Sequence, residues 1–335
     1  MKVFELTGQG LGSLSLAERP APTPGPRELL VRVRAASLNY RDLAVAGHGY
    51  GNFPRPLIPL SDGAGEVVAL GPGSARFAVG DRVVLGYIPD WVAGPPTEAA
   101  TRRRLGGPLD GTAAELIAIS EEAAVAIPAH LSFGEAATLP IAGVTAWRAL
   151  FEISRVQPGE TVVIQGTGGV SLFALTLARL AGATPIVTSS SDAKLARATA
   201  LGAAHGINYR TTPAWDAQVR ALTGGRGADH VIDVAGGPSL DRSIGAVRLG
   251  GTVVLVGFVT GAATSLDLTA AIRRAVRLES LSGGSRHSLE ALVAALAAHR
   301  ARPVIDRVFA FDELPAALAH LASGGPFGKV VVTFP

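Results

Sequence analysis

The sequence of 335 residues contains no cysteine, and only 17% of its residues are charged. Without cysteine, disulfide bonds, thiolate zinc sites and catalytic thiols are excluded. The 30 lysine and arginine residues barely outnumber the 27 aspartate and glutamate residues, which gives a formal net charge of +3. So small an imbalance predicts no nucleic-acid partner, although it is compatible with an anionic cofactor.

Long hydrophobic runs are also absent. No uninterrupted apolar stretch approaches the ~18 to 20 residues that a membrane-spanning helix needs. The opening stretch, MKVFELTGQGLGSLSLAERP, holds no apolar segment of the length found in a signal peptide. We therefore expect a cytoplasmic protein with no membrane partner.

The composition is that of a globular protein, with 48% hydrophobic residues, 41 glycines and 22 prolines. These values exclude a disordered chain, a coiled coil and a collagen-like repeat. At roughly 150 residues per domain, the length predicts about two domains.

The first part of the chain is rich in short β-branched runs that glycine and proline separate, among them LLVRVRAASLN, GEVVALG, DRVVLGY and AELIAIS. This pattern predicts a β-rich domain over residues 1–130. Residues 88–111 are expected to form a long loop with one helical turn. The strands expected near the C-terminus resemble those at the start, so residues 285–335 are predicted to return to this domain.

Residues 131–284 show a different pattern, in which β-branched runs alternate with helical segments. Such an alternation predicts a parallel sheet with helices on both faces. The expected strands cover 161–165, 186–189, 206–209, 230–234, 252–256 and 277–281. The expected helices cover 170–180, 193–201, 215–223, 240–247 and 268–275.

The segment VVIQGTGGVSLFALTLA begins this alternation with a strand, a glycine-rich turn and an apolar helix. A dinucleotide pyrophosphate binds such a turn because glycines allow close approach and the helix start offers free N–H groups. Gly166 and Gly168 fill the first two positions of the G-x-G-x-x-G pattern, and Ser171 replaces the third glycine. An ordinary strand-to-helix turn is the alternative. The expected cofactor-binding residues here are Gly166, Thr167, Gly168, Gly169 and Val170.

The end of the next expected strand bears on the choice of coenzyme. An acid at this point would bind the ribose 2′-hydroxyl of NAD, but Ser189 and Ser190 stand here and Asp192 comes later. Hydroxyls together with Lys194 favour the 2′-phosphate of NADP(H). The same residues are also typical of a helix cap, and both interpretations can hold at once.

With these residues in place, the chain resembles the medium-chain dehydrogenase/reductase superfamily, and most closely its zinc-independent, quinone oxidoreductase-like members. The resemblance covers essentially the full length. It implies an α/β protein with a GroES-like β-rich catalytic domain and a doubly wound Rossmann domain that together hold the nicotinamide. The motifs that carry it are SLNYRD (37–42), PLIPLSDGAGEVVALGPG (56–73), GDRV (80–83), TAW (145–147), QGTGGV (165–170) and FGKVVV (327–332).

The resemblance also implies the absence of a metal. Zinc-using members have a cysteine where this chain has Asn39 and a histidine where it has Ser61, followed by an acid that Asp62 matches. The cysteine-rich lobe that binds a structural zinc is missing as well. We expect no metal, since two of the ligands that zinc prefers are lost.

Further cofactor contacts follow from the resemblance. Tyr209 matches a tyrosine that holds the adenosine phosphate, although a half-buried aromatic at a strand end is an equal alternative. Thr145 lies on a helix that relatives point at the nicotinamide. Other expected contacts lie at strand ends and in two later motifs, namely Val234, Ala235, Val256, Gly257, Phe258, Gly284, Ser285 and Lys329.

Hydride transfer without a metal favours a quinone or an α,β-unsaturated carbonyl, because the negative charge then spreads into a phenolate or an enolate. Asn39 and Tyr50 are the candidate catalytic residues, against the alternatives of a turn residue and a surface aromatic. Arg41 and Asp42 are expected to form a structural ion pair or cap, and His48 to lie in an exposed loop.

Three functions stay open from the sequence. The first is an NADPH-dependent oxidoreductase that acts on a small-molecule quinone or enone. The second is an NADP-dependent alcohol dehydrogenase or carbonyl reductase without zinc, and the third is a non-catalytic NADPH-binding sensor or structural protein. Relatives often pair the last Rossmann strand edge to edge, so a homodimer or a tetramer through residues 277–281 is expected.

Overall fold

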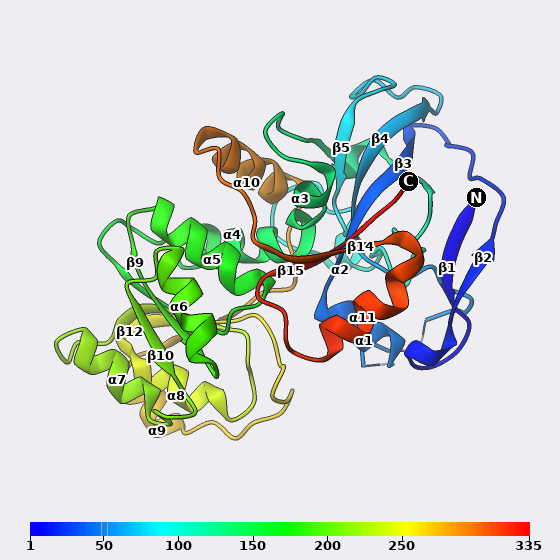
Figure 1. Ribbon diagram of the computed structural model, residues 1–335. Helices are drawn as coiled ribbons and strands as arrows, with labels where there is room; N and C mark the ends of the chain where they lie inside the picture. Colours follow the sequence, from blue (N-terminus) through cyan, green and yellow to red (C-terminus); the bar gives the residue numbers. More distant parts are fainter. Residues whose placement is uncertain (48, 52) are drawn as a thin grey trace. The chain divides into compact units, whose positions relative to one another are not determined.

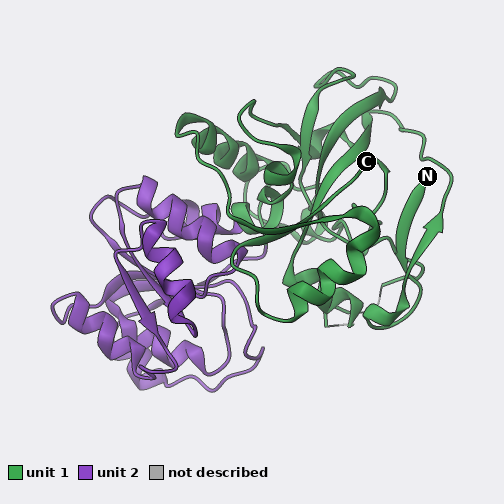
Figure 2. Cartoon of the chain, in the orientation of Figure 1, with its two compact units in different colours: residues 1–144, 283–335 green, residues 145–282 purple. Residues whose placement is uncertain are grey.

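The computed structural model describes residues 1–47, 49–51 and 53–335, and these divide into two compact units. Unit 1 comprises Met1–Val144 and Gly283–Pro335, and unit 2 comprises Thr145–Ser282 (Figure 2). The expected boundaries followed residues 130 and 284. Residues 131–144 group with unit 1 because helix α3 (Phe133–Ala137) packs against strands of its sheet.

Unit 1 holds a seven-stranded sheet in the order β14-β15-β3-β4-β5-β7, with β6 paired to β3, among the residues that the structure describes. Its centre is β3 (Glu28–Leu38), which pairs antiparallel with β4, β6 and β15. The other strands are β4 (Asp62–Leu70), β5 (Arg82–Leu85), β6 (Leu116–Ser120), β7 (Ala124–Ala126), β14 (Ile305–Ala310) and β15 (Lys329–Thr333). A separate two-stranded sheet contains β1 (Lys2–Leu6) and β2 (Leu14–Glu18).

β15 pairs with β3, so the C-terminal part of the chain lies in the same sheet as the β-rich N-terminal part (Figure 1). The register of this pairing places Val330 opposite Leu38. The helices of unit 1 are α1 (Tyr40–Ala46), α2 (Glu98–Thr101), α3, α10 (Arg286–Ala298) and α11 (Leu314–Ala322). Helix α2 is the single helical turn expected within residues 88–111.

Unit 2 is built on a six-stranded sheet in the order β10-β9-β8-β11-β12-β13. All of its strand pairs are parallel. This is the strand order of a doubly wound dinucleotide-binding fold, whose order reverses between β8 and β11. The strands are β8 (Thr161–Gln165), β9 (Thr184–Ser189), β10 (His205–Asn208), β11 (Ala228–Asp233), β12 (Val247–Leu255) and β13 (Arg277–Ser280).

The helices of unit 2 follow its strands in alternation, as the sequence predicts. They are α4 (Val144–Trp147, which starts on the last residue of unit 1), α5 (Gly169–Leu180), α6 (Asp192–Ala200), α7 (Trp215–Leu222), α8 (Ser239–Ala246) and α9 (Leu268–Arg273). Helix α5 packs on β8 and β9, and α8 packs on β11 and β12. All five residues of β8 are buried, as expected for a strand covered on both sides. The α/β class, with one β-rich domain and one doubly wound parallel-sheet domain, is therefore confirmed.

Two elements differ from expectation. Strand β12 starts at Val247 rather than at residue 252, because an irregularity in β11 lets Ala228 pair with Val247. The helical stretch after Phe133 contains two wider, π-helical segments at Leu139–Gly143 and Arg148–Ile153. The first contains Pro140, which lacks the N–H group that a regular α-helix uses.

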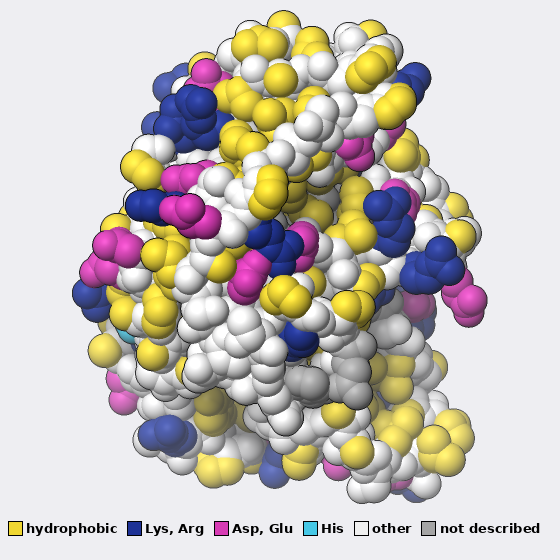
Figure 3. Space-filling view, turned by 90° about the vertical axis from the view of Figure 1, so that its right-hand side faces the viewer, with side chains coloured by type: hydrophobic (Ala, Val, Ile, Leu, Met, Phe, Trp, Pro, Cys, Tyr) yellow, Lys and Arg dark blue, Asp and Glu magenta, His cyan; other side chains and the backbone are white. Residues whose placement is uncertain are grey.

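The surface carries both signs of charge. On the face in Figure 3, lysine and arginine side chains lie interspersed with aspartate and glutamate. This mixture agrees with the small net charge of +3. Among the described residues, the helices are all too short or too polar to span a membrane.

Candidate coenzyme site and buried polar cluster

The turn between β8 and α5 has the backbone that a pyrophosphate site requires. Gly166 has a positive φ of 73°, a conformation that favours glycine. Gly168 is the N-cap of α5, and a Cβ built at this residue meets nothing within 4 Å. The space beside Gly168 is therefore open, and the first N–H groups of α5 have no partner within the helix itself. These features fit the phosphates of a nicotinamide coenzyme.

The replacement of the third glycine by serine also has a structural explanation. The hydroxyl of Ser171 is buried and donates a 2.7 Å hydrogen bond to the carbonyl oxygen of Gln165. A small residue lets α5 pack closely on β8, and this hydroxyl fixes the start of the helix to the end of the strand. Ser171 therefore takes over the packing role of the glycine.

Gln165 is a residue that the sequence reasoning missed. Its amide nitrogen donates to the hydroxyls of Ser243 at 2.8 Å and Ser239 at 3.1 Å, and its amide oxygen accepts from the N–H of Ala235 at 3.2 Å. Gln165 thereby joins the ends of β8 and β11. In the sequence, a glutamine at the end of the otherwise apolar run VVIQ indicates that a polar side chain lies at this strand end.

The ends of β9 and β10 bring together the residues expected at the adenosine phosphate. Ser189 ends β9 and is buried, and its carbonyl accepts the N–H of Tyr209 at 3.0 Å. Tyr209 follows β10 directly and is 42% exposed. Ser190 comes next after β9, and Lys194 lies in the first turn of α6, whose N-cap is Ser191.

Asp192 does not lie at the tip of β9. It belongs to the first turn of α6, where its carboxylate accepts a 2.8 Å hydrogen bond from the amide of Asn208. The strand end therefore carries hydroxyls rather than an acid. The cap interpretation of this segment is also correct, because the Ser191 hydroxyl accepts the N–H of Lys194 at 3.4 Å.

The remaining expected residues of unit 2 lie after β11 and β12. Val234 and Ala235 follow β11, and Asp233 holds this turn by accepting the N–H groups of Ala235 at 3.0 Å and Gly236 at 2.8 Å. Residues 256–258 follow β12, and a Cβ on Gly257 would lie 2.6 Å from the carbonyl oxygen of Val234.

Because the strands are parallel, their carboxyl ends share one edge of the sheet. The structure therefore gathers at this edge most of the cofactor residues expected in unit 2, namely Gly166, Thr167, Gly168, Gly169, Val170, Ser189, Ser190, Lys194, Tyr209, Val234, Ala235, Val256, Gly257 and Phe258. Thr145 is also in unit 2 and is buried on α4.

Unit 1 contains a second constellation, a buried polar cluster centred on Asp62. One Asp62 carboxylate oxygen, Oδ2, accepts from the Asn39 amide at 2.8 Å and from the Ser37 hydroxyl at 3.1 Å. The ammonium of Lys329 donates to Asn39 Oδ1 at 2.7 Å and to the carbonyl of Leu38 at 2.7 Å. The same ammonium lies 3.5 Å from Asp62 Oδ2.

The cluster continues into the start of α1. The Asp42 carboxylate accepts the N–H of its N-cap residue Asn39 at 2.7 Å, which closes a capping box. Arg41 Nε donates to Ser61 Oγ at 3.1 Å, and another arginine nitrogen donates to the carbonyl of Gly107. Asp42 therefore acts as a helix cap, as expected. His48 lies outside the described residues.

Burial determines the protonation equilibria of this cluster. Desolvation raises the pKa of Asp42 to about 7, although the N–H of Asn39 opposes the shift. Desolvation likewise raises the pKa of Asp62 and lowers the pKa of Lys329, while the opposite charge of each partner works against both shifts. The two carboxyls and the ammonium thus form one coupled buried system.

A zinc ion does not fit these residues. Zinc takes thiolate, imidazole or carboxylate ligands, and of Asn39, Ser61 and Asp62 only Asp62 offers one. Moreover, Asn39 and Asp62 are engaged with Lys329. No group of three or more histidines, aspartates or glutamates that could hold a metal occurs among the described residues.

Tyr50 is 38% exposed, and the guanidinium of Arg41 lies over its ring at 5.4 Å from the centroid. Partial burial raises the pKa of its hydroxyl, whereas the positive charges of Arg41 and Arg104 oppose this shift. The hydroxyl is therefore kept in its protonated form, which is able to donate a hydrogen bond.

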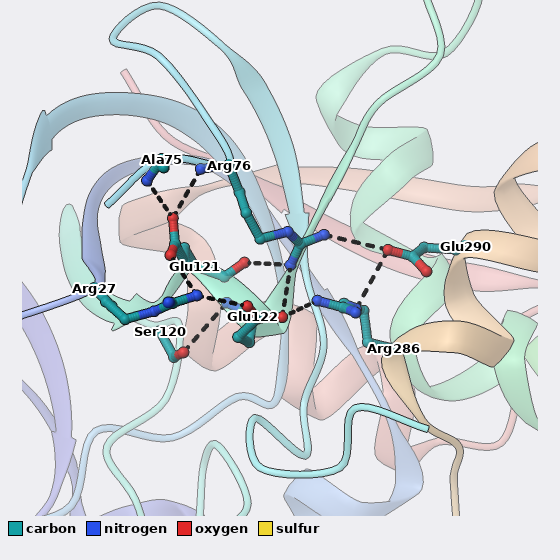
Figure 4. A network of polar contacts seen from close by, with 8 residues as sticks. All are labelled: Arg27, Ala75, Arg76, Ser120, Glu121, Glu122, Arg286 and Glu290. Atoms are coloured by element: carbon teal, nitrogen blue, oxygen red, sulfur yellow. Dashed lines mark hydrogen bonds and ion pairs between the residues drawn. The ribbon is translucent and has the colours of Figure 1, made fainter. Parts of the chain in front are cut away.

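Gly284 and Ser285 precede α10 in unit 1. The hydroxyl of Ser285 caps this helix by accepting the N–H of Ser288 at 3.1 Å. Arg286, the first residue of this helix, forms ion pairs with Glu290 in the same helix and with Glu122 of the short 3-10 helix Glu121–Ala123 (Figure 4). The same network includes Arg27, Arg76 and Glu121.

Comparison with known proteins agrees with this architecture. Two family models match the chain, one described as an alcohol dehydrogenase GroES-like domain over residues 25–129 and one as a zinc-binding dehydrogenase over residues 169–298. A zinc-type alcohol dehydrogenase-like protein of Schizosaccharomyces pombe is 42% identical over 317 residues, which cover 92% of this chain and 91% of the relative.

Solved structures show the same fold over the full chain. A candidate alcohol dehydrogenase from Sinorhizobium meliloti 1021 superimposes with a TM-score of 0.94 at 43% identity, covering 99% of this chain and 98% of the other. A quinone oxidoreductase from Pseudomonas syringae pv. tomato DC3000 does so with a TM-score of 0.84 at 26% identity, covering 99% of each chain. The chain is therefore an oxidoreductase of the medium-chain dehydrogenase/reductase superfamily, whose members bind a nicotinamide coenzyme.

Proposed function

We propose that this protein is a zinc-independent, NADPH-dependent oxidoreductase that transfers hydride to a quinone or an α,β-unsaturated carbonyl compound. The observation that carries the coenzyme part is the end of β9. Ser189, Ser190, Lys194 and Tyr209 lie there, whereas the nearest acid, Asp192, lies in the first turn of α6 and accepts a hydrogen bond from Asn208.

A 2′-phosphate carries negative charge that a carboxylate at the strand end would repel. Hydroxyl groups and an ammonium instead supply hydrogen bonds to its oxygens and a compensating charge. The phenol of Tyr209 adds a further donor beside Ser189. In this proposal Gly166, Gly168 and the start of α5 hold the pyrophosphate, and the turns after β11 and β12 hold the nicotinamide half.

The bound coenzyme supplies the hydride, and the protein must stabilise the charge that appears on the acceptor. Asn39, Ser61 and Asp62 do not fit a zinc ion, so in this proposal hydrogen-bond donors stabilise that charge. A conjugated acceptor delocalises the charge and needs less stabilisation than an alkoxide does. We propose Tyr50 as the residue that donates a hydrogen bond to the enolate or phenolate oxygen.

Asn39 has a more limited role in this proposal. Its amide oxygen is bonded to Lys329, and its amide nitrogen is bonded to Asp62 and, at 3.4 Å, to the carbonyl of Ser37. We propose that Asn39 shapes the reaction site rather than donating a proton. Rotation of the amide would break each of these contacts at once.

Carbonyl reduction is the second candidate function. The alcohol dehydrogenase names of the relatives from Schizosaccharomyces pombe and Sinorhizobium meliloti favour it. The chemistry of a site without a Lewis acid favours the first candidate.

An assay with defined products distinguishes the two functions. The purified protein is mixed with NADPH and a panel of quinones, enones, aldehydes and ketones, NADPH consumption is followed by absorbance, and the products are identified by mass spectrometry. A saturated ketone formed from an enone, or a hydroquinone formed from a quinone, supports the proposal. An alcohol as the only product supports carbonyl reduction, and tight NADPH binding without turnover supports a non-catalytic sensor or structural protein.

We also propose a homodimer or a tetramer through the edge of unit 2. β13 is the last strand in the sheet order, and its residues are mostly exposed. An exposed edge strand is a template for pairing with a second copy. Replacing Leu278 by proline should remove a backbone donor and reduce the molar mass measured by light scattering, and an unchanged mass would contradict this interface.

A further inference from the structure

The buried cluster of unit 1 contains a fixed positive charge at the positions that match metal ligands in zinc-using relatives. Asn39, Ser61 and Asp62 occupy those positions. In the structure each of them contacts a charged nitrogen: Lys329 Nζ lies 2.7 Å from Asn39 Oδ1 and 3.5 Å from Asp62 Oδ2, and Arg41 Nε lies 3.1 Å from Ser61 Oγ. The oxygens that would surround a metal therefore face cationic side chains.

Oxygen atoms surround the ammonium of Lys329, as they would surround a bound cation. An ammonium has three N–H donors and no acceptor, and three oxygens surround this one, from Leu38, Asn39 and Asp62. The Lys329 side chain is 3% exposed and the Asp62 side chain 0% exposed. Water therefore does not reach the ammonium, and these protein oxygens are its hydrogen-bond acceptors.

Charge balance explains why the ammonium is needed. Asp42 and Asp62 are buried carboxyls, and the buried cations Arg41 and Lys329 oppose their negative charge. One Asp62 oxygen, Oδ1, has no hydrogen-bond partner among the described residues, so its charge depends on the groups around Oδ2. A buried carboxylate that loses its partner is strongly destabilising.

We propose that Lys329 replaces the metal ion of zinc-using relatives, as an internal ammonium that neutralises Asp62 and positions Asn39. Lys329 is thus a positioning residue rather than a group that binds zinc or exchanges with it. The family model described as a zinc-binding dehydrogenase matches the chain, but its metal does not transfer to this protein. This inference is independent of the acceptor that the protein reduces.

Metal analysis gives the first test. The protein is produced in medium supplemented with zinc and analysed by mass spectrometry for elements, before and after dialysis against EDTA. We expect substoichiometric zinc and the same melting temperature in both samples. One zinc per chain that EDTA removes, with a fall in the melting temperature, would overturn the proposal.

A double-mutant cycle tests the charge compensation. Lys329→Met should lower the melting temperature strongly, because Asp62 is left buried without its cation, and Asp62→Asn should do so as well. The double variant Lys329→Met with Asp62→Asn should regain most of the loss. Lys2→Met, at an exposed lysine, is the matched control and should change little. Purely additive losses in the double variant would contradict the proposal.

The absence of cysteine allows a chemical test of positioning. Lys329→Cys introduces a single thiol, which is alkylated in denaturant with 2-bromoethylamine to give a lysine analogue, or with iodoacetamide to give a neutral one. The resemblance implies a coenzyme contact for Lys329, but in the structure its ammonium is buried against Leu38, Asn39 and Asp62. After refolding, we therefore expect both products to bind NADPH equally, since the coenzyme turn belongs to unit 2.

The two alkylated proteins should differ in turnover and in stability. The neutral product should melt at a lower temperature and show a kcat lower by about 10- to 100-fold, the effect of one lost charged hydrogen bond. Equal melting temperatures for the two products would overturn the proposal even if no acceptor is known. In a further outcome, neither product reduces an acceptor, while only the charged product melts at the temperature of the unmodified protein. That result would contradict the proposed function and still support the ammonium site.

Discussion

Ser171 and Gln165 are joined by a 2.7 Å hydrogen bond from the serine hydroxyl to the glutamine main-chain carbonyl, six residues apart across the coenzyme turn. Ser171→Ala should lower the free energy of unfolding by about 1 kcal/mol, the usual net value of one hydrogen bond. Urea denaturation measures this change. Ser171→Gly should also lose this hydrogen bond, while it keeps the close packing of α5 on β8. Ser171→Thr retains a hydroxyl, but its extra methyl group should crowd α5 against β8. No change in Ser171→Ala would contradict the role assigned to the hydroxyl.

A substitution at Gly168 should weaken coenzyme binding far more than it lowers the stability of the fold. Its φ is −80°, which any residue adopts, and an added Cβ meets nothing within 4 Å. Because alanine is a poorer N-cap residue than glycine, Gly168→Ala should lower the free energy of unfolding by no more than about 1 kcal/mol. The methyl group would occupy the space for the pyrophosphate, so the NADPH dissociation constant should rise by about tenfold or more.

Fluorescence titration with NADPH measures the effect at Gly168. Gly12→Ala is the matched control, since its added Cβ also meets nothing within 4 Å and it lies in unit 1. That variant should bind NADPH like the unmodified protein. Unchanged binding by Gly168→Ala would place the pyrophosphate elsewhere.

Lys194 is expected to determine the preference between the two coenzymes. Lys194→Glu places a negative charge in the first turn of α6, beside the end of β9. The dissociation constant for NADPH should rise by about 10- to 100-fold, as a charge-assisted hydrogen bond is lost, while that for NADH should change little. Calorimetry with both coenzymes checks this.

The control for Lys194 is Arg197→Glu, the same charge reversal on the same helix. If Arg197→Glu and Lys194→Glu weaken NADPH equally, the effect is a general change of surface charge. An equal loss of NADPH and NADH affinity in Lys194→Glu would show that the 2′-phosphate does not contact this residue.

Asp42 makes the stability of the protein depend on pH. Burial raises its pKa in the folded protein from 3.8 to about 7, so the folded state binds this proton more tightly than the unfolded chain does. Its contribution to stability is therefore complete at acidic pH and is lost as the pH rises from about 4 to about 7, by up to about 1.4 kcal/mol per pH unit.

Asp42→Asn should remove this part of the pH dependence, because the amide oxygen is still able to accept the N–H of Asn39 and carries no charge. The free energy of unfolding, measured in urea at pH 5 and at pH 8, should differ less in the variant than in the unmodified protein. Asp312→Asn, at an exposed aspartate, is the control. A steeper pH dependence in Asp42→Asn would contradict the direction of the pKa shift.

The sequence predicts the architecture well where the pattern is local. Alternating β-branched and helical segments identify the strands and helices of unit 2, and the glycine turn identifies where its coenzyme edge begins. The contact between Lys329 and Asn39 could not be predicted in this way, because it joins residues 290 apart. It follows from the register of β15 on β3, which pairs Val330 with Leu38.

The same reasoning applies to Gln165 and to the π-helical segments. A glutamine at a strand end indicates a polar partner, but its partners Ser239 and Ser243 are set by the packing of α8 on β11. Pro140 signals a departure from a regular α-helix without specifying its form. Local sequence therefore predicts that such features exist, and tertiary packing decides their geometry.

The interrupted course of unit 1 along the chain has a consequence for biosynthesis. Unit 2 is a single continuous segment, residues 145–282, so all of it leaves the ribosome before the end of the chain is made. Unit 2 is therefore able to fold while translation proceeds. Unit 1 is complete only when residues 283–335, which include its strand β15, have been synthesised. Lys329 belongs to that last strand, so the buried ion pair between Asp62 and Lys329 forms only after the end of the chain has been synthesised.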